Sequence, residues 1–284
     1  MGTLAEALHA AATCLSDSDS PRLDAELLLA HTLGKDRSYL RAHPDASLTP
    51  AQAAEFERLM AARARGEPVA YLTAKREFWS LELKVTPATL IPRPETELLV
   101  EQALALIPPH VDWQVADLGT GSGAIALAIA KERPRCHVTA VDVSQEALGV
   151  AQHNAHALDI DNVEFLQGDW FTPLGERRFH VIASNPPYVG DSDPHLREGD
   201  LRFEPPQALS SGADGLRDIR RIVSDAPRHL ADGGHLLLEH GHGQGAAVRA
   251  LLRSVGFASP RSFRDLSGLE RVSVGDWANP RDPR

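Results

Sequence analysis

The chain has 284 residues, 43% of them hydrophobic, which is enough to bury a substantial core in two domains. Its 39 acidic residues outnumber its 29 basic ones, so it lacks the positive charge that phosphate-binding proteins usually carry, and we expect no direct contact with nucleic acid. No apolar run approaches the roughly 18 residues of a membrane span, and the start lacks a basic signal-peptide region, so we expect a cytoplasmic protein without membrane contact.

Residues 1–72 have the pattern of a small helical domain. Apolar residues recur at helical spacings in three stretches, 4–15, 23–33 and 51–65. The breaks between them contain the prolines and polar residues that are typical of loops. Residues 73–91 follow as a linker, in which apolar and polar residues alternate from Glu77 to Leu90 and predict a β-hairpin.

The remaining residues, 92–284, alternate between strand and helix patterns. Candidate strands contain Val115, Val138, Val163, Val181 and Leu236, with helical stretches between most of them. This alternation predicts an α/β domain with a mostly parallel, doubly wound sheet. A last strand is predicted over residues 270–275.

A glycine-rich loop separates a predicted strand at 113–118 from a predicted helix at 124–133. Its residues are Gly119, Thr120, Gly121, Ser122 and Gly123. Glycines let a ligand approach the backbone, and the helix start presents free N–H groups, so this loop indicates a nucleotide-like cofactor. The spacing also fits a variant of the dinucleotide fingerprint, so the glycines alone do not exclude a nicotinamide-dependent dehydrogenase.

Two acidic residues flank this loop in the predicted sheet. Asp142 ends a predicted strand at 137–142, where an acid binds ribose hydroxyls in units of this kind, although it also fits an ordinary strand end. Asp117 stands two residues before the first glycine. A carboxylate there repels a pyrophosphate and attracts a sulfonium or ammonium group, so it argues against a dinucleotide.

A rigid polar and aromatic corner follows the apolar run at 180–184. It consists of Asn185, Pro186, Pro187 and Tyr188. The Asn185 side-chain oxygen and the Pro186 carbonyl can each accept one hydrogen of a planar –NH2 group, while Tyr188 stacks against its plane. The alternative is a simple proline turn that ends the strand.

In this order, these segments resemble the class I S-adenosylmethionine-dependent methyltransferases that have an amino group as acceptor. Within them, the chain is similar to the HemK family of protein glutamine methyltransferases, from its first helices to Gly275. The closer match rests on Glu67-Pro-Val-Ala-Tyr-Leu72 with Glu77-Phe78, Leu90-Ile-Pro-Arg-Pro-Glu-Thr-Glu97 and Gly199-Asp-Leu-Arg-Phe-Glu-Pro205. Ala74 departs from the family pattern, where glycine is usual, which implies a turn that accepts a Cβ.

The resemblance implies a Rossmann-like fold with a seven-stranded, mostly parallel sheet, joined by the hairpin to the small helical domain. It also implies S-adenosyl-L-methionine as the cofactor, with the glycine loop at its methionine end, Asp142 at the ribose, and Asp169 and Trp170 beside the adenine. The residues expected to bind the cofactor are Gly119, Thr120, Gly121, Ser122, Gly123, Asp142, Trp170 and Asn185.

The resemblance further implies a peptide chain release factor as the protein substrate, methylated on the side-chain amide nitrogen of the glutamine in its Gly-Gly-Gln motif. The helical domain is then expected to dock that partner. Asn185, Pro186 and Tyr188 are the expected catalytic residues, and Pro187 joins them in binding the substrate. Arg93 and Glu95 lie in a proline-flanked segment that is expected to close over the reacting groups, or to form a surface ion pair instead.

Three rival functions share part of this pattern. A glutamine methyltransferase of a ribosomal protein has the same corner but generally differs in the Ile91–Thr96 segment. An adenine-amino methyltransferase also has Asn or Asp before Pro-Pro-aromatic, but the acidic composition argues against nucleic acid. A non-catalytic binding module is expected to have a damaged loop or corner, and both are intact here.

We expect neither a metal nor a disulfide. Cys14 and Cys136 lie far apart without metal-ligand spacing. Glu239, His240 and His242 lie close together after a predicted strand, but no further ligand at the spacing of a metal site accompanies this cluster.

Overall fold

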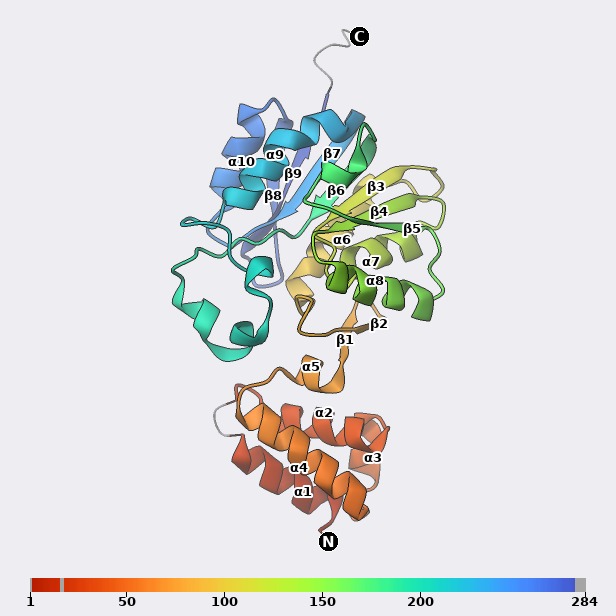
Figure 1. The fold of residues 1–284 in the computed structure, drawn as a ribbon, viewed down its shortest axis with the longest axis vertical. Helices are drawn as coiled ribbons and strands as arrows, with labels where there is room; N and C mark the ends of the chain where they lie inside the picture. Colours follow the sequence, from red (N-terminus) through yellow and green to blue (C-terminus); the bar gives the residue numbers. More distant parts are fainter. Residues whose placement is uncertain (1, 16–17, 279–284) are drawn as a thin grey trace. The chain divides into compact units, whose positions relative to one another are not determined.

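The computed structural model describes residues 2–15 and 18–278 and divides into two compact units (Figure 1). The first unit comprises the described residues up to Lys75 together with Glu198–Phe203. The second comprises Arg76–Arg197 and the described residues from Glu204 onward. Each unit has a hydrophobic core of its own.

The first unit is helical, as the apolar periodicity predicts. Its helices are α1 Leu4–Cys14, α2 Pro21–Leu33, α3 Arg37–Ala42, α4 Pro50–Ala64 and α5 Val69–Thr73. Capping boxes begin α1 at Thr3 and α4 at Thr49, because each threonine accepts a hydrogen bond from the N–H of the third helical residue. The short helices α3 and α5 were not predicted, since five or six residues show too little periodicity.

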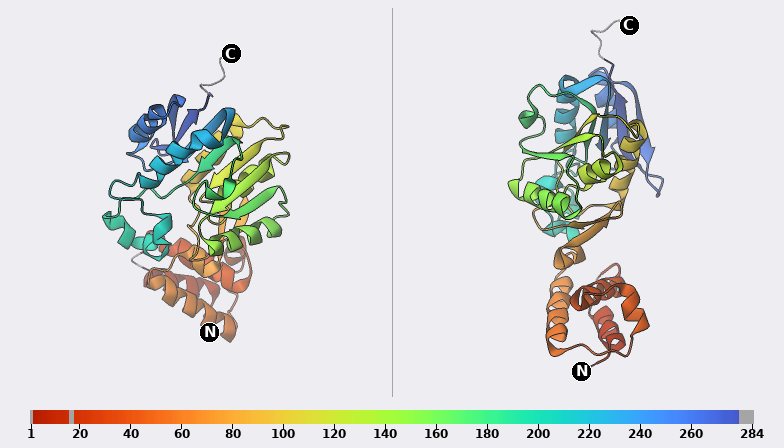
Figure 2. Two further views of the ribbon diagram at one scale, coloured as in Figure 1. Left: turned by 45° about the horizontal axis from the view of Figure 1, so that its top comes forward. Right: turned by 90° about the vertical axis from the view of Figure 1, so that its right-hand side faces the viewer.

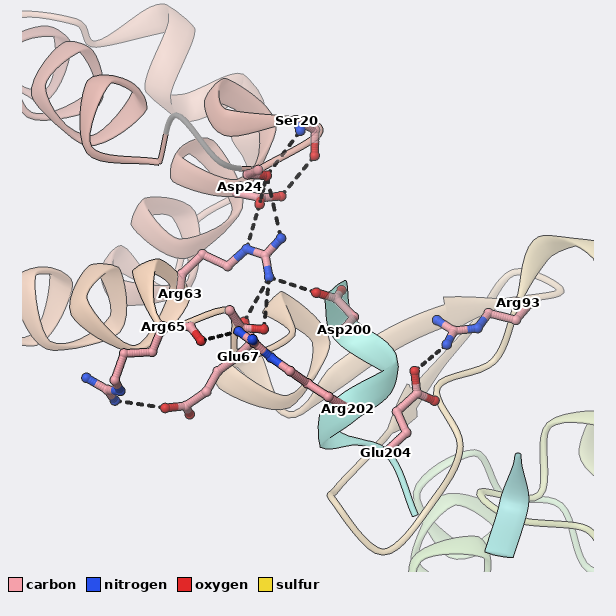
Figure 3. A network of polar contacts seen from close by, with 11 residues as sticks. Ser20, Asp24, Arg63, Arg65, Glu67, Arg93, Asp200, Arg202 and Glu204 are labelled. Atoms are coloured by element: carbon pink, nitrogen blue, oxygen red, sulfur yellow. Dashed lines mark hydrogen bonds and ion pairs between the residues drawn. The ribbon is translucent and has the colours of Figure 1, made fainter. Parts of the chain in front are cut away.

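An ion-pair network ties a distant segment of the chain to these helices (Figure 3). Arg63, with a side chain only 12% exposed, contacts Asp24 at 2.7 Å and Asp200 at 2.8 Å. Arg202 donates a hydrogen bond to the Arg65 carbonyl. Asp200 and Arg202 lie in the 3₁₀ helix η4, Gly199–Phe203, which therefore belongs to the helical unit although it follows the fourth strand of the large sheet.

A two-stranded hairpin comes next, with β1 Lys75–Phe78 and β2 Leu81–Lys84. Ala74, just before it, has a φ of +55°, so this turn holds a Cβ in the left-handed region that favours glycine. The hairpin ends at Lys84, earlier than the alternation up to residue 90 predicts. Phe78, Leu81 and Leu83 are buried in the core of the second unit.

The second unit is built on a seven-stranded sheet, as predicted. In spatial order its strands are β5 Val163–Gln167, β4 His137–Asp142, β3 Gln114–Leu118, β6 Phe179–Ser184, β7 Leu230–Glu239, β9 Glu270–Asp276 and β8 Ala258–Arg264. The first five of these are parallel, whereas β9 runs antiparallel to both β7 and β8. Strand β8 was not predicted, because its residues are half-buried or exposed and its sequence is polar.

Helices cover both faces of this sheet (Figures 1 and 2). Helices α6 Glu97–Leu106, α7 Ala124–Glu132 and α8 Gln145–Ala157 share one core cluster with the hairpin. Helices α9 Arg217–His229 and α10 Gly245–Ser254 form the other cluster. Among the helices of the described residues, none is long and apolar enough to cross a membrane.

Short 3₁₀ helices complete the second unit. They are η1 Pro94–Thr96, η2 Thr172–Leu174, η3 Pro194–Arg197 and η5 Pro206–Ala208. The chain order reverses between β3 and β6, since the chain leaves β3 toward β4 on one side and returns to β6 on the other. Ligands of open parallel sheets bind outside the carboxyl ends of the strands at such a reversal.

Candidate active site

A cavity of about 260 Å³ opens at this reversal. Its walls come from the loops that follow four parallel strands: Gly119 and Gly121 after β3, Asp142 at the end of β4, Trp170 after β5 and Asn185 after β6. These residues are separated in sequence, and the parallel sheet brings them together. The loop after β6 also contributes Pro187 and Pro205.

The glycine loop turns tightly against the sheet. Gly119, Gly121 and Gly123 have φ angles of +76°, +56° and +86°, which a side chain would strain. The N–H groups of Gly119 and Thr120 donate to the Val141 carbonyl at 2.8 and 2.9 Å. A Cβ on Gly119 would lie 3.3 Å from the Trp170 ring, so the bare backbone lets this indole approach the loop.

Asp117 supports the loop from inside the core. It is fully buried, and its Oδ2 accepts hydrogen bonds from the Thr120 hydroxyl at 2.7 Å and the Ala126 N–H at 3.1 Å. Its Oδ1 has no hydrogen-bond partner among the described residues. Burial raises the pKa of Asp117 to about 7 despite these donors. Asp117 thus joins the loop to the start of α7, a structural role that the sequence pattern did not indicate.

Asp142 faces the cavity from the end of β4. Its Oδ2 accepts the Gly121 N–H at 2.8 Å, and its Oδ1 accepts the Ser144 N–H at 2.9 Å. Each oxygen keeps one further lone pair, so the carboxylate can also accept hydrogen bonds from ligand hydroxyl groups. Burial raises its pKa.

Trp170 and Asp169 form the wall after β5. Trp170 lines the cavity with a φ of +51°, a backbone conformation that side chains rarely adopt. Asp169 also lines it and forms an ion pair with Arg221 at 2.6 Å, which balances its charge.

The proline corner begins where β6 ends beside β3. The Ser184 hydroxyl donates to the Leu118 carbonyl at 2.6 Å and so joins the two strand ends. The Asn185 side-chain nitrogen donates to the Thr96 hydroxyl at 3.2 Å. The Tyr188 hydroxyl donates to Glu239 at 3.3 Å, and its ring packs against the second core cluster.

Six of the predicted site residues line the cavity: Gly119, Gly121, Asp142, Trp170, Asn185 and Pro187. Thr120, Ser122 and Gly123 are buried within the same loop. The expected catalytic residues Pro186 and Tyr188 do not line the cavity; Pro186 is buried and Tyr188 half-buried. Arg93 contacts the buried carboxylate of Glu204 within the second unit (Figure 3), so it takes part in an internal ion pair.

Several residues of this site were not predicted from the sequence. Leu90 and Gln207 line the cavity, and Thr96 holds Asn185. Leu90 and Thr96 lie in a segment that carried the family resemblance, but nothing in it indicated which side chains face the site. Glu239 stands beside two histidines in the sequence, and that pattern did not indicate its contact with Tyr188. His240 uses both ring nitrogens, toward Ser273 and Gly241.

Known proteins agree with this architecture. A family model described as PrmC N-terminal domain matches residues 6–73, and one described as methyltransferase small domain matches residues 94–198. A release factor glutamine methyltransferase of Pseudomonas aeruginosa is 56% identical over 265 residues, 93% of this chain and 95% of that protein. One of Vibrio cholerae is 51% identical over 286 residues, 99% of each. The chain belongs to the release factor glutamine methyltransferases.

Solved structures agree on the fold of this family member. A methyltransferase from Pyrococcus furiosus superposes with a TM-score of 0.54 at 18% identity, covering 78% of this chain and 99% of that one. A Thermus thermophilus 16S rRNA N2 G1207 methyltransferase, in complex with AdoMet and guanosine, gives 0.53 at 20% identity, covering 71% and 49%. The fold is that of the class I methyltransferases, and the chain is an S-adenosylmethionine-dependent methyltransferase.

Proposed function

We propose that this chain methylates the side-chain amide nitrogen of the glutamine in the Gly-Gly-Gln motif of a peptide chain release factor. The observation that carries the proposal is the position of Asn185 and Pro187 on the wall of the same cavity as Gly119 and Gly121. The residues expected to accept the amide thus line the same cavity as the loop expected to hold the cofactor. The names of the relatives and the intact Ile91–Thr96 segment support the choice of protein substrate.

The cavity suits S-adenosylmethionine in the chemistry of its walls. The backbone of residues 119–123 would hold the methionine end, where the positive φ angles leave room for close approach. The Asp142 carboxylate would accept the ribose hydroxyls, and Trp170 would stack on the adenine. When bound, the cofactor supplies a methyl group activated by a sulfonium.

The amide nitrogen that the proline corner would bind is a poor nucleophile. The lone pair of an amide nitrogen is delocalised into its carbonyl, so positioning must supply much of the catalysis. The Asn185 Oδ1 and the Pro186 carbonyl would accept the two amide hydrogens and so fix the orientation of the nitrogen. Positive charge would grow on the nitrogen as it gains the methyl group, so both acceptors would stabilise the transition state more than the bound substrate, and one of the two hydrogens would then leave as a proton to solvent.

The same acceptors explain discrimination against glutamate. A glutamate carboxylate has no hydrogens to donate and would place its oxygens against those of Asn185 and Pro186. Sites built on hydrogen bonds to the substrate reject analogues that lack them by roughly 10⁴ to 10⁵.

We assign docking of the release factor to the helical domain, residues 1–72, with 73–91 as the linker and 92–284 as the methyltransferase domain. The match of residues 6–73 to a domain model of its own supports a dedicated role for this part of the chain. A side-chain glutamine in a folded partner needs recognition beyond the pocket itself. Such a substrate implies a cytoplasmic enzyme without direct contact to nucleic acid.

The test is methyl transfer from labelled S-adenosylmethionine to a purified release factor, with the labelled residue mapped by mass spectrometry. Label on the Gly-Gly-Gln glutamine, and none on a factor with that glutamine changed to glutamate, is the expected result. Label on duplex DNA or on a ribosomal protein, with none on the release factor, would overturn the proposal.

A further inference from the structure

A buried asparagine of α8 connects two segments that border the cavity. Asn154 is 2% exposed and lies beside the small buried residues Ala151 and Ala155 of the same helix. Its side-chain nitrogen donates to the Ser122 carbonyl at 2.9 Å, inside the glycine loop. The same nitrogen donates to the Lys84 carbonyl at 3.0 Å, and the Asn154 side-chain oxygen accepts the Lys84 N–H at 2.8 Å. One amide therefore holds two distant parts of the chain.

The three partners fix the orientation of the Asn154 amide. Backbone carbonyls only accept hydrogen bonds, so the NH2 group has to face Ser122 and Lys84, and the Lys84 N–H needs the side-chain oxygen. Both amide hydrogens and the oxygen are thus used. Among residues of this shape only asparagine can form the set, because leucine has no polar atom and an aspartate carboxylate has no hydrogen to donate.

The bond to Ser122 supports the glycine loop where the helix pattern cannot. In a continuous helix the Ala126 N–H would donate to the Ser122 carbonyl, four residues earlier. Here it donates to Asp117 at 3.1 Å, and a glycine with a positive φ stands on each side of Ser122. Asn154 therefore takes the place of the helical partner of this carbonyl and fixes the middle of the loop.

Close packing of the loop on α8 makes this bond possible. A Cβ added to Gly123 would lie 3.2 Å from the Cβ of Ala151, tighter than most contacts between side chains. Ala151 precedes Asn154 by three residues, so both lie on one face of the helix. The missing side chain of Gly123 thus lets the loop approach the face that carries Asn154.

The bonds to Lys84 fix the start of a second wall of the cavity. Lys84 ends β2, and the chain continues into residues 88–90, which line the cavity. The turn between them is rigid, because the Thr89 N–H and the Thr89 hydroxyl both donate to the Thr86 carbonyl, at 2.9 and 3.2 Å. The place of Lys84 therefore determines where residues 88–90 meet the cavity.

We propose that Asn154 is a positioning residue for the cofactor, because it holds the glycine loop and the segment that leads to residues 88–90 in one arrangement. A purely structural role would need only an apolar side chain on this face of α8, without the cost of burying an amide. The inference rests on the proposed placement of S-adenosylmethionine in this cavity. It requires that cofactor bound at the loop also stabilises the Lys84 contact, since one side chain holds both.

The first test is the affinity of the whole chain for S-adenosylmethionine, measured by calorimetry. Asn154→Ala removes all three bonds, and we expect the dissociation constant to rise at least about tenfold, an effect that one lost hydrogen bond can produce. Unchanged affinity in Asn154→Ala would overturn the proposal.

Asn162→Ala is the matched control for this test. The Asn162 side-chain nitrogen also donates to backbone carbonyls, those of Ala130 and Cys136 at 3.2 and 3.0 Å. Asn162 precedes β5 at the amino ends of the parallel strands, however, whereas the cavity lies at their carboxyl ends. The control should lose stability and keep the wild-type dissociation constant. An equal rise in both variants would mean that Asn154 acts only through general stability, and the proposal would fail.

The second test needs only the wild type, so it decides the question even if Asn154→Ala does not fold. Exchange of the Lys84 amide hydrogen with solvent, followed by NMR, should slow about tenfold when S-adenosylmethionine is added, because coupling between two contacts is reciprocal. The Ser80 amide, which donates to Glu77 within the hairpin, is the internal control and should keep its rate. Exchange at Lys84 that ignores the cofactor, or equal slowing at Ser80, would refute the coupling.

Neither measurement involves a release factor, so the two proposals can fail separately. A wild type that gives both expected results and methylates no release factor would confirm the role of Asn154 and refute only the proposed function. Gly119→Ala checks the shared assumption. If it binds S-adenosylmethionine as tightly as the wild type, the cofactor does not lie on the glycine loop, and the inference about Asn154 is wrong.

Discussion

The Asp117 carboxylate and the Thr120 hydroxyl are 2.7 Å apart beneath the glycine loop. This contact joins the end of β3 to the loop, and the second bond of Asp117, to the Ala126 N–H, joins it to the first turn of α7. One buried carboxylate therefore sets the path of the backbone on which the cofactor would lie.

Asp117→Asn should stabilise the protein at high pH and not at low pH. The folded pKa of about 7 lies above the ordinary value of 3.8, so the neutral form is favoured in the fold. The stability contributed by this group is full below pH 3.8 and is lost as the pH rises toward 7. The neutral amide avoids that loss, which amounts to at most about 4 kcal/mol. Thermal midpoints at pH 4.5 and 8 test this; an equal shift at both would contradict it.

Asn185→Ala should abolish most methyl transfer and leave the fold intact. The variant loses one of two acceptors for the substrate amide, a change that we expect to lower kcat about a hundredfold or more. The thermal midpoint and the circular dichroism spectrum serve as controls for folding. Near-normal turnover would mean that the corner does not hold the substrate nitrogen.

Gly119→Ala should weaken cofactor binding. The added Cβ lies 3.3 Å from Trp170, at a φ of +76° where a side chain costs about 1–2 kcal/mol. Gly149→Ala is the matched control, because Gly149 lies in α8 without a positive φ, and a Cβ added there would meet nothing within 4 Å. The control should bind S-adenosylmethionine normally and gain up to about 1 kcal/mol of stability. Equal dissociation constants for the two variants would show that the loop accepts a side chain.

Arg63→Ala should destabilise the helical unit by about 2 kcal/mol, since it leaves the buried Asp24 without its ion partner. Arg58→Ala provides the control: Arg58 pairs with Glu55 in the same helix, but both side chains are exposed, so its loss should cost less than about 1 kcal/mol. Urea unfolding measures both. The released Asp200 contact should also make Gly199–Phe203 more sensitive to limited proteolysis in Arg63→Ala than in Arg58→Ala. Identical unfolding curves and cleavage rates would argue that the network is dispensable.

The elements with local signals could be predicted from the amino-acid sequence. Apolar alternation and helical periodicity predict the core strands and the longer helices, because burial of one face imposes a period on the chain. The glycine loop and the proline corner could also be predicted, since a positive φ favours glycine and consecutive prolines end a strand. Parallel strands carry their carboxyl ends to one edge, so a common site for both motifs followed from the predicted topology.

The distant side chains that complete this site become visible only in the folded chain. The contacts of Asn185 with Thr96 and of Tyr188 with Glu239 join residues from the loop after β6, from η1 and from the end of β7, and no sequence period relates them. The inclusion of Gly199–Phe203 in the helical unit depends likewise on the pairing of Arg63 with Asp200, 137 positions apart. Hydrogen bonds and ion pairs need atoms within a few ångströms in three dimensions, and packing of the whole chain, rather than local pattern, brings those atoms together.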